Sequence, residues 1–258
     1  MGAASELALS TALSTRVRAV LFDVDGTLYR QGPVRARMAL ELLLAPIALR
    51  SLGRARRAWR AIGAFRRAQE ELRAAPPPSG DGDGKGDGEP LDLARLQRRR
   101  AAERAGLSEA EVEAVVDEWM GRRPLRHLRR FRRPGVLPFL DFLAARGIEA
   151  GVLSDYPAEA KLEAMGLAGR FAVALCTTGP GIGAFKPHPR GFLRACEALG
   201  LRPAEVLYVG DRPDVDGAGA LAAGMPCAII SGRARAGSGG AFEIDTFERL
   251  RRELESRL

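Results

Sequence analysis

Short apolar segments of strand length alternate with longer helical stretches along this chain, and several of these segments end in polar side chains. The clearest are 20–22, 148–153 and 206–210, which run into Asp23, Ser154 and Asp211. Single strands separated by helices are typical of a Rossmann-like, doubly wound parallel α/β sheet. Ligands bind beyond the carboxyl ends of such strands. The chain has 258 residues, 46% of them hydrophobic, and can bury the core of one large domain or two small ones.

Two aspartates, Asp23 and Asp25, follow the first apolar segment and precede Gly26 and Thr27. Residues i and i+2 of a strand point to one side, and a glycine turn can bring the second carboxylate over the first. One carboxylate can then attack phosphorus while the other protonates the departing alkoxide. The same D-x-D-G spacing begins EF-hand loops, but such a loop needs a glutamate at its twelfth position, where this chain has Val34.

A hydroxyl and a lysine are predicted to hold phosphate. Ser154, followed by Asp155, stands at the end of the segment at 148–153, where a hydroxyl can bind a phosphate oxygen. Lys186 precedes a helix predicted over Arg190–Leu199, and both the ammonium and the helix N-terminus favour an anion.

A group of carboxylates follows the segment at 206–210. Asp211 comes first, and Asp214 and Asp216 stand close behind it. Carboxylates at this edge can carry a magnesium ion that bridges to a substrate phosphate.

These four motifs, in this order and spacing, resemble those of the haloacid dehalogenase-like hydrolase superfamily over roughly residues 18 to 230. The resemblance implies that Asp23 is the nucleophile and a metal ligand, and that Asp25 is the general acid and base and binds metal through its main-chain carbonyl. It implies phosphate binding by Ser154, Asp155 and Lys186. It further implies metal binding by Asp211 and Asp216; in some relatives the positions of Asp214 and Asp216 share the support of the metal shell.

The second aspartate narrows the chemistry. Superfamily members that remove halide typically lack it, because halide leaves without a proton, whereas an alkoxide needs a proton donor. Asp25 therefore favours a magnesium-dependent phosphatase that acts on a small phosphomonoester through an aspartyl-phosphate. The alternatives are a phosphomutase of the same superfamily and a non-catalytic nucleic-acid-binding or regulatory module. Neither the substrate nor the oligomeric state follows from the sequence.

Residues 30–133 are predicted to form an all-helical cap, inserted into a catalytic core made of residues 1–29 and 134–258. The insertion carries a net charge of +10 and the rest of the chain −2. This charge fits a solvated arginine-rich surface, a field that draws in anionic substrates, or binding of nucleic acid or an anionic membrane surface, for which no nucleic-acid fold signature is present. The Pro- and Gly-rich stretch at 76–90 is predicted to be disordered.

The remaining features predict an ordinary cytoplasmic protein. The cysteines, which lie at 176, 196 and 227, are odd in number and set among apolar residues, as in a reduced protein. The most apolar run, 38–49, is too short to span a membrane, and the N-terminus lacks the pattern of a secretion signal. Trp59 and Trp119 are expected in the cap core, and 242–258 is expected to form a closing amphipathic helix.

Overall fold

The computed structural model describes residues 16–48, 51–75, 92–179, 181–230 and 241–256, which divide into two compact units. The sheet unit combines the described residues of segments 1–30, 132–177 and 186–258. The helical unit combines those of segments 31–131 and 178–185.

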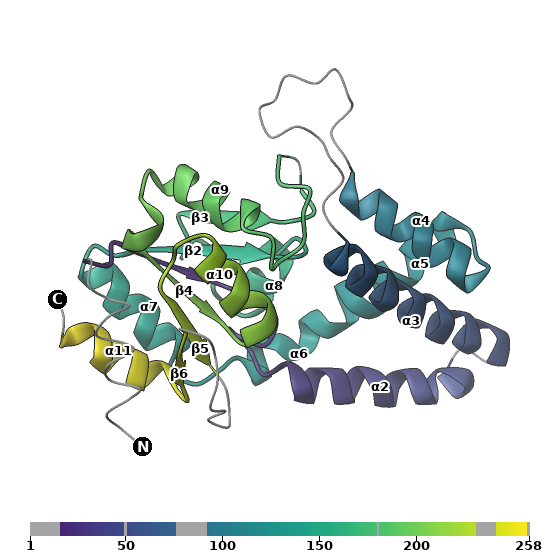
Figure 1. The fold of residues 1–258 in the computed structure, drawn as a ribbon. Coiled ribbons are helices and arrows are strands. Elements are labelled where there is room, and N and C mark those ends of the chain that lie inside the picture. The colour runs from purple at the N-terminus through teal and green to yellow at the C-terminus, as the bar shows by residue number, and fades with distance from the viewer. Residues whose placement is uncertain (1–15, 49–50, 76–91, 180, 231–240, 257–258) are drawn as a thin grey trace. The chain divides into compact units, whose positions relative to one another are not determined.

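The sheet unit contains six strands, every neighbouring pair of which is parallel, in the order β3-β2-β1-β4-β5-β6 (Figure 1). This order confirms the predicted Rossmann-like α/β fold. The strands are β1 (Ala19–Phe22), β2 (Glu149–Ser154), β3 (Val173–Cys176), β4 (Val206–Gly210), β5 (Cys227–Ile230) and β6 (Phe242–Ile244).

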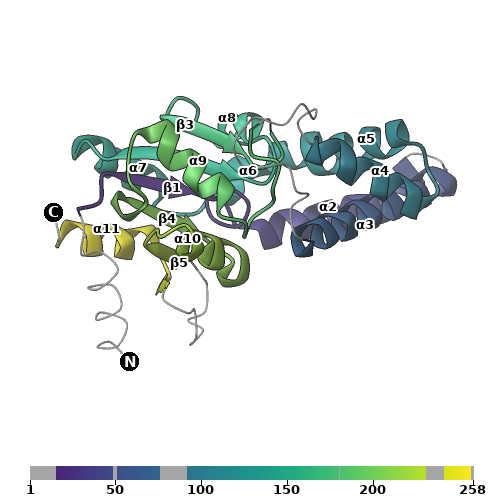
Figure 2. The same cartoon turned by 45° about the horizontal axis from the view of Figure 1, so that its top comes forward.

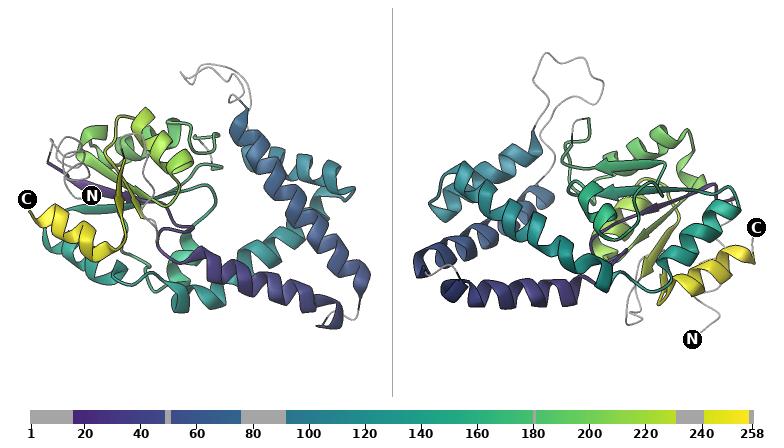
Figure 3. Two further views of the ribbon diagram at one scale, coloured as in Figure 1. Left: turned by 60° about the horizontal axis from the view of Figure 1, so that its bottom comes forward. Right: turned by 180° about the vertical axis from the view of Figure 1, so that it is seen from behind.

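Helices cover both faces of this sheet. α9 and α10 lie on one face, and α7 and α11 lie on the other (Figures 1 and 3). The helices of this unit are α7 (Val136–Ala145), α8 (Glu159–Ala164), α9 (Arg190–Leu199), α10 (Ala218–Ala222) and α11 (Phe247–Glu255), with a 3₁₀ turn at Pro203–Glu205 and a π-helical turn at Pro213–Gly217.

Alternation along the central strands assigns side chains to these two faces. The ring of Phe22 in β1 contacts Phe139 of α7 and Phe247 of α11. Tyr208 of β4 pairs in register with Leu21, the residue before Phe22, and therefore points to the opposite face of the sheet. There its ring contacts Phe192 of α9. Both faces therefore bury aromatic side chains, while the polar residues collect at the ends of the strands.

The register places those ends together. Phe22 is aligned with Val152 of β2 and with Val209 of β4. The next residue, Asp23, continues the ladder by donating its N–H to the carbonyl of Val209 (2.9 Å). Asp23, Ser154 and Asp211 consequently lie at the same edge of the sheet.

Apart from the segment at 178–185, the described residues of the helical unit form α-helices and one π-helical turn, with α4 and α5 packed beside α3 (Figure 2). The long helix α3 buries a stripe of small side chains that allows the close approach: Ala55, Ala58, Ala61, Ala64 and Ala68. A capping box forms at α5, where Ser108 and Glu111 exchange hydrogen bonds of 3.0 and 3.2 Å. The elements are α2 (Gln31–Ala48), α3 (Leu52–Ala74), α4 (Leu93–Ala105), α5 (Glu109–Val116), the π-helical turn at Asp117–Arg122 and α6 (Arg123–Phe131).

Two expectations are wrong in detail. The segment at 242–258 does not begin as a helix, because Phe242–Ile244 joins the sheet beside β5 as β6 and the helix starts only at Phe247. Trp119 is buried, but Trp59 is 46% exposed, because the buried face of α3 is formed mainly by alanines.

Some of the other expectations fall on residues that the structure does not describe. The stretch at 76–90 lies outside the described residues, as does the N-terminus up to residue 15. The three cysteines form no disulfide. Among the described residues, no helix is both long and apolar enough to cross a membrane.

Candidate active site

Asp23 is a buried carboxylate, only 5% exposed, at the end of β1. Its Oδ1 accepts a hydrogen bond from Lys186 Nζ (2.6 Å), and its Oδ2 accepts one from Thr27 Oγ1 (3.2 Å). Burial raises the pKa of Asp23 well above its usual range, and the charge of Lys186 opposes this only in part. Each oxygen accepts one hydrogen bond here and retains a further lone pair for a ligand.

The ammonium of Lys186 is fully coordinated. It donates to Asp23, to Asp216 Oδ1 (2.8 Å) and to the Tyr208 hydroxyl (3.1 Å), which in turn donates to Asp216 Oδ1 (3.0 Å). Burial opposes the charge, but the two carboxylates outweigh it and hold the pKa of Lys186 well above its usual value. Lys186 is therefore a fixed cation beside the first aspartate.

Asp25 lies in a separate network and does not share this lysine as a hydrogen-bond partner. Lys161 Nζ, from α8, donates to its Oδ2 (2.5 Å), and the Tyr29 hydroxyl donates to its Oδ1. Burial alone would raise the pKa of Asp25, but the charge and hydrogen bond of Lys161 and the hydrogen bond of Tyr29 outweigh it and lower that pKa. Two carboxylates two residues apart thus have different partners and opposite shifts.

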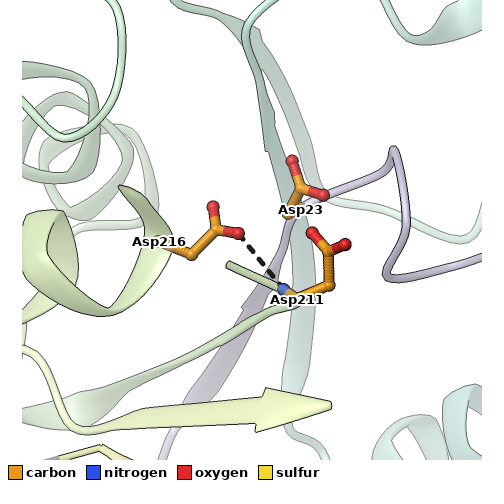
Figure 4. A group of neighbouring side chains, drawn as sticks. All are labelled: Asp23, Asp211 and Asp216. Atoms are coloured by element: carbon orange, nitrogen blue, oxygen red, sulfur yellow. Dashed lines mark hydrogen bonds between the residues drawn. The ribbon is translucent and has the colours of Figure 1, made fainter. Parts of the chain in front are cut away.

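Asp211 and Asp23 face one another at the carboxyl ends of the strands, with Asp216 to one side of them (Figure 4). One oxygen of each of these three carboxylates lies within 4.8 Å of the others. In the described part of the chain no hydrogen bond reaches the carboxylate of Asp211. Burial, together with the charge of Asp216, raises its pKa to about 7.

Two glycines make room for these carboxylates. Gly26 adopts φ 104°, and a Cβ there would lie 2.0 Å from Asp211 Oδ2. A Cβ on Gly210 would lie 2.3 Å from the Cβ of Asp216. Both positions therefore require glycine, the first for its backbone conformation as well as for space.

The carboxylate set fits a magnesium ion, which prefers oxygen ligands and is commonly held by one or two carboxylates together with water and substrate phosphate. Asp23 and Asp211 have lone pairs directed to a common space. Asp216 is less open, because its Oδ1 accepts from Lys186 and Tyr208 while its Oδ2 accepts from the backbone N–H groups of Asp211 and Arg212 (both 3.1 Å). Asp216 thus orders the turn that presents Asp211.

The phosphate-binding residues predicted after β2 are also tied into the loops. Ser154 is buried, and its Oγ accepts from Tyr156 N (3.4 Å). The carboxylate of Asp155 accepts from Thr177 Oγ1 (2.9 Å) and from the backbone N–H of Lys186 (3.3 Å). Asp155 therefore links two loops through its carboxylate, and its contact with phosphate stays a prediction.

Asp214 lies apart from the other carboxylates. Its side chain is exposed and pairs with Arg212 (2.6 Å). The ambiguity between the two acidic positions after Asp211 is thus resolved in geometry, because Asp216 is the one that turns inward.

Four residues of this region were not singled out from the sequence: Tyr29, Arg133, Lys161 and Tyr208. Tyr208 reads as one more apolar strand residue, and its hydroxyl matters only once Lys186 is placed beside it. Lys161 is the third residue of the short helix α8, and only its charge distinguishes it there. Arg133 donates from Nε and Nη2 to the carbonyl of Gly26 (3.1 and 2.7 Å), which fixes the turn after Asp25.

The sequence also resembles curated proteins. A phosphoglycolate phosphatase of Xylella fastidiosa is 30% identical over 222 residues, which are 82% of this chain and 79% of that protein. A phosphoglycolate phosphatase of Rhodospirillum rubrum is 39% identical over 101 residues, which are 38% of this chain and 41% of that protein. This chain thus spans about two fifths of the length of the second relative.

Solved structures share the fold along nearly the whole chain. A HAD phosphatase from Thermococcus onnurineus is 25% identical with a TM-score of 0.59, covering 92% of this chain and 98% of that one. A 2-haloacid dehalogenase from Pseudomonas syringae pv. Tomato is 26% identical with a TM-score of 0.62, covering 94% of this chain and 100% of that one. The family model described as haloacid dehalogenase-like hydrolase matches residues 17–224. The chain belongs to the haloacid dehalogenase-like hydrolase family.

Proposed function

We propose that this chain is a magnesium-dependent phosphatase that hydrolyses a small phosphomonoester through an aspartyl-phosphate on Asp23. The observation that carries the proposal is the pair of carboxylates with separate partners, Asp23 on Lys186 and Asp25 on Lys161. A nucleophile and a proton donor must differ in protonation during the reaction. In the free site the shifts run the other way, because the pKa of Asp23 is raised and that of Asp25 is lowered, so binding of substrate and magnesium must ionise Asp23 and protonate Asp25 before the first step. The phosphatases among the relatives and solved structures support the same reaction.

In the first step an oxygen of Asp23 forms a bond to phosphorus while the bond from phosphorus to the ester oxygen breaks. Asp25 gives a proton to that oxygen, so the alcohol leaves neutral. In the second step Asp25 takes a proton from water, the water oxygen bonds to phosphorus, and the bond from Asp23 to phosphorus breaks. The sum is ester plus water to alcohol plus phosphate, with both aspartates restored.

Other residues of the site hold the phosphoryl group and its charge. Lys186 stays beside Asp23 throughout, and the Ser154 hydroxyl is proposed to hold a phosphate oxygen. Magnesium, held by Asp23, Asp211 and the main-chain carbonyl of Asp25 with Asp216 in support, would offset negative charge on the phosphate oxygens. The named activity of the relatives makes phosphoglycolate the first substrate to test.

The test is phosphate release from a panel of small phosphomonoesters, with magnesium and with a chelator, by the wild type and Asp23→Asn. We expect turnover that needs magnesium and falls at least about a thousandfold in Asp23→Asn. Asp141→Asn is the matched control, because Asp141 is an exposed carboxylate of the same unit that pairs with Arg170. It should keep the wild-type rate.

A second readout does not depend on activity. Magnesium should raise the melting temperature of the wild type and raise that of Asp211→Asn much less, because a ligand that binds the folded state stabilises it. Undiminished turnover by Asp23→Asn, or turnover that is indifferent to the chelator, would overturn the proposal. An isomerised sugar phosphate in place of free phosphate would indicate a mutase, and halide release from a haloacid would indicate the activity named for the Pseudomonas structure.

A further inference from the structure

Lys161 is the second lysine beside the aspartates at the carboxyl ends of the strands, and it has no role in the reaction described so far. It lies on α8, the helix that follows the Ser154 loop, and its Nζ is 2.5 Å from Asp25 Oδ2. Its side chain is 16% exposed, whereas that of Lys186 is 4% exposed. Lys161 therefore lies in the candidate site with part of its side chain accessible to a ligand.

The two lysines differ in how many of their N–H donors are used. The ammonium of Lys186 has three acceptors, namely Asp23, Asp216 and Tyr208. Among the described residues, Lys161 Nζ has one acceptor, Asp25. An ammonium has three donors, so Lys161 can bind an anionic ligand without giving up its aspartate.

The reaction fixes where such an anion has to be. The ester oxygen of the substrate must come within hydrogen-bond reach of Asp25 to receive its proton. A group on the carbon that bears this oxygen then lies close to the Asp25 carboxylate, and Lys161 Nζ is 2.5 Å from Oδ2 of that carboxylate. A carboxylate there meets the donors of Lys161, whereas a hydroxyl or methyl group offers them little.

We propose that Lys161 selects substrates that carry a carboxylate on the carbon adjacent to the phosphoester oxygen, as phosphoglycolate does. The inference rests on the proposed phosphatase activity and adds to it a residue and a substrate class. Lys186 serves the phosphate end of the substrate, and Lys161 serves the acid end of the leaving group. The division follows from their partners, because each lysine is held by a different aspartate of the motif.

The test compares phosphoglycolate with hydroxyethyl phosphate, in which CH2OH replaces the carboxylate at equal length. The wild type should prefer phosphoglycolate in kcat/KM. In Lys161→Gln we expect kcat/KM to fall about 10- to 100-fold more for phosphoglycolate than for hydroxyethyl phosphate, because a hydrogen bond between charged groups is lost only with the acid. Lys161→Arg keeps the charge and should keep most of the preference.

Arg170→Gln is the matched control. Arg170 forms an ion pair of the same length, 2.5 Å to Asp141, but on the exposed surface of the same unit. Its removal should leave the ratio of the two substrates as in the wild type.

The outcomes separate the two proposals. If Lys161→Gln slows both esters equally, Lys161 only supports Asp25 and the inference is wrong while the phosphatase stands. If the wild type releases phosphate from neither ester nor from the wider panel, the proposed function itself fails and the inference falls with it.

A measurement on the wild type alone covers the case in which Lys161→Gln does not fold. Glycolate should inhibit hydrolysis of hydroxyethyl phosphate competitively, and ethylene glycol at the same concentration should not. Equal or absent inhibition by the two compounds contradicts a carboxylate site at Lys161.

Discussion

The two units of this protein treat charge in opposite ways. The sheet unit buries Asp23, Lys186 and Asp216 almost completely and joins them in one network. In the described residues of the helical unit, Gln97 is the only buried polar side chain, and the ion pairs lie at or near the surface. Burying ions costs free energy, and a stable fold can form without buried ions. The few charges of the sheet unit therefore indicate function better than the many arginines of the helical unit.

The cores of the two units also differ in the size of the side chains that they bury. The sheet unit packs large rings on both faces, among them Phe22, Phe139 and Phe192. The long helix of the other unit buries mainly alanines. Removing a buried charge should harm the first unit most, and enlarging a buried side chain should harm the second.

The largest effect is expected for Lys186→Met. It leaves two buried carboxylates without their cation, which should lower the free energy of unfolding by about 3–5 kcal/mol and abolish phosphate release. Urea denaturation followed by circular dichroism measures the first effect. Arg104→Met, which breaks an exposed ion pair with Glu71, is the control and should change stability by less than about 1 kcal/mol. Equal effects of the two variants would remove the contrast between the units.

The next largest effect is expected in the alanine stripe. Ala61 is fully buried on α3, and Ala61→Leu should lower the free energy of unfolding by about 1–3 kcal/mol, because the added methyl groups meet a closely packed neighbour. Ala74→Leu places the same side chain at the exposed end of the same helix and should be nearly neutral. A stable Ala61→Leu variant would show that the helical unit packs loosely.

A smaller effect is expected for Tyr208→Phe. The variant keeps the ring against Phe192 but loses the hydroxyl shared by Lys186 and Asp216, which still contact each other directly at 2.8 Å. We expect a loss of about 1 kcal/mol in stability and a fall in kcat of at most about tenfold, with KM little changed. Steady-state kinetics measures this split, and a hundredfold loss would give the hydroxyl a larger part than positioning.

The smallest effect is expected for Glu41→Gln in the helical unit. Glu41 joins α2 to Arg126 and His127 of α6; its modest burial opposes ionisation, but those partners outweigh burial and lower its pKa. A lowered pKa stabilises the fold above the ordinary glutamate pKa, and this stabilisation is lost as the pH falls through the folded-state pKa. Thermal melting should therefore show a deficit under about 1 kcal/mol at neutral pH that vanishes in strong acid. A deficit that persists in strong acid would mean that packing, and not charge, is lost.

The strand ends could be predicted from the sequence because each carries its signal locally. An apolar run followed by Asp23, Ser154 or Asp211 is visible within a few residues, and the helix over Arg190–Leu199 was predicted with its exact bounds. Asp216 was assigned through the family resemblance, and the structure adds that its side chain is buried whereas that of Asp214 is exposed.

The rest depends on partners distant in the sequence. Lys161 is 136 residues from Asp25, and nothing near either of them announces the contact. The three residues of β6 alternate too briefly to be told from a helix, and only the adjacent strand β5 decides the matter. The exposure of Trp59 likewise follows from how closely alanine-faced helices approach, which a hydrophobicity pattern does not record.

The chain leaves and re-enters the sheet unit through one paired crossing. Tyr29 and Arg132 form an antiparallel bridge, and the backbone N–H of Arg133 donates to the carbonyl of Leu28 (2.9 Å). The hundred or so residues between these positions begin and end at neighbouring points. They form an insertion whose two ends are held together by backbone pairing. Replacing this insertion leaves Asp25 in place only if the backbone pairing at Tyr29 is kept, because the Tyr29 hydroxyl also donates to Asp25. The sequence between these two points can therefore vary without moving Asp25, as long as Tyr29 and Arg133 keep their contacts.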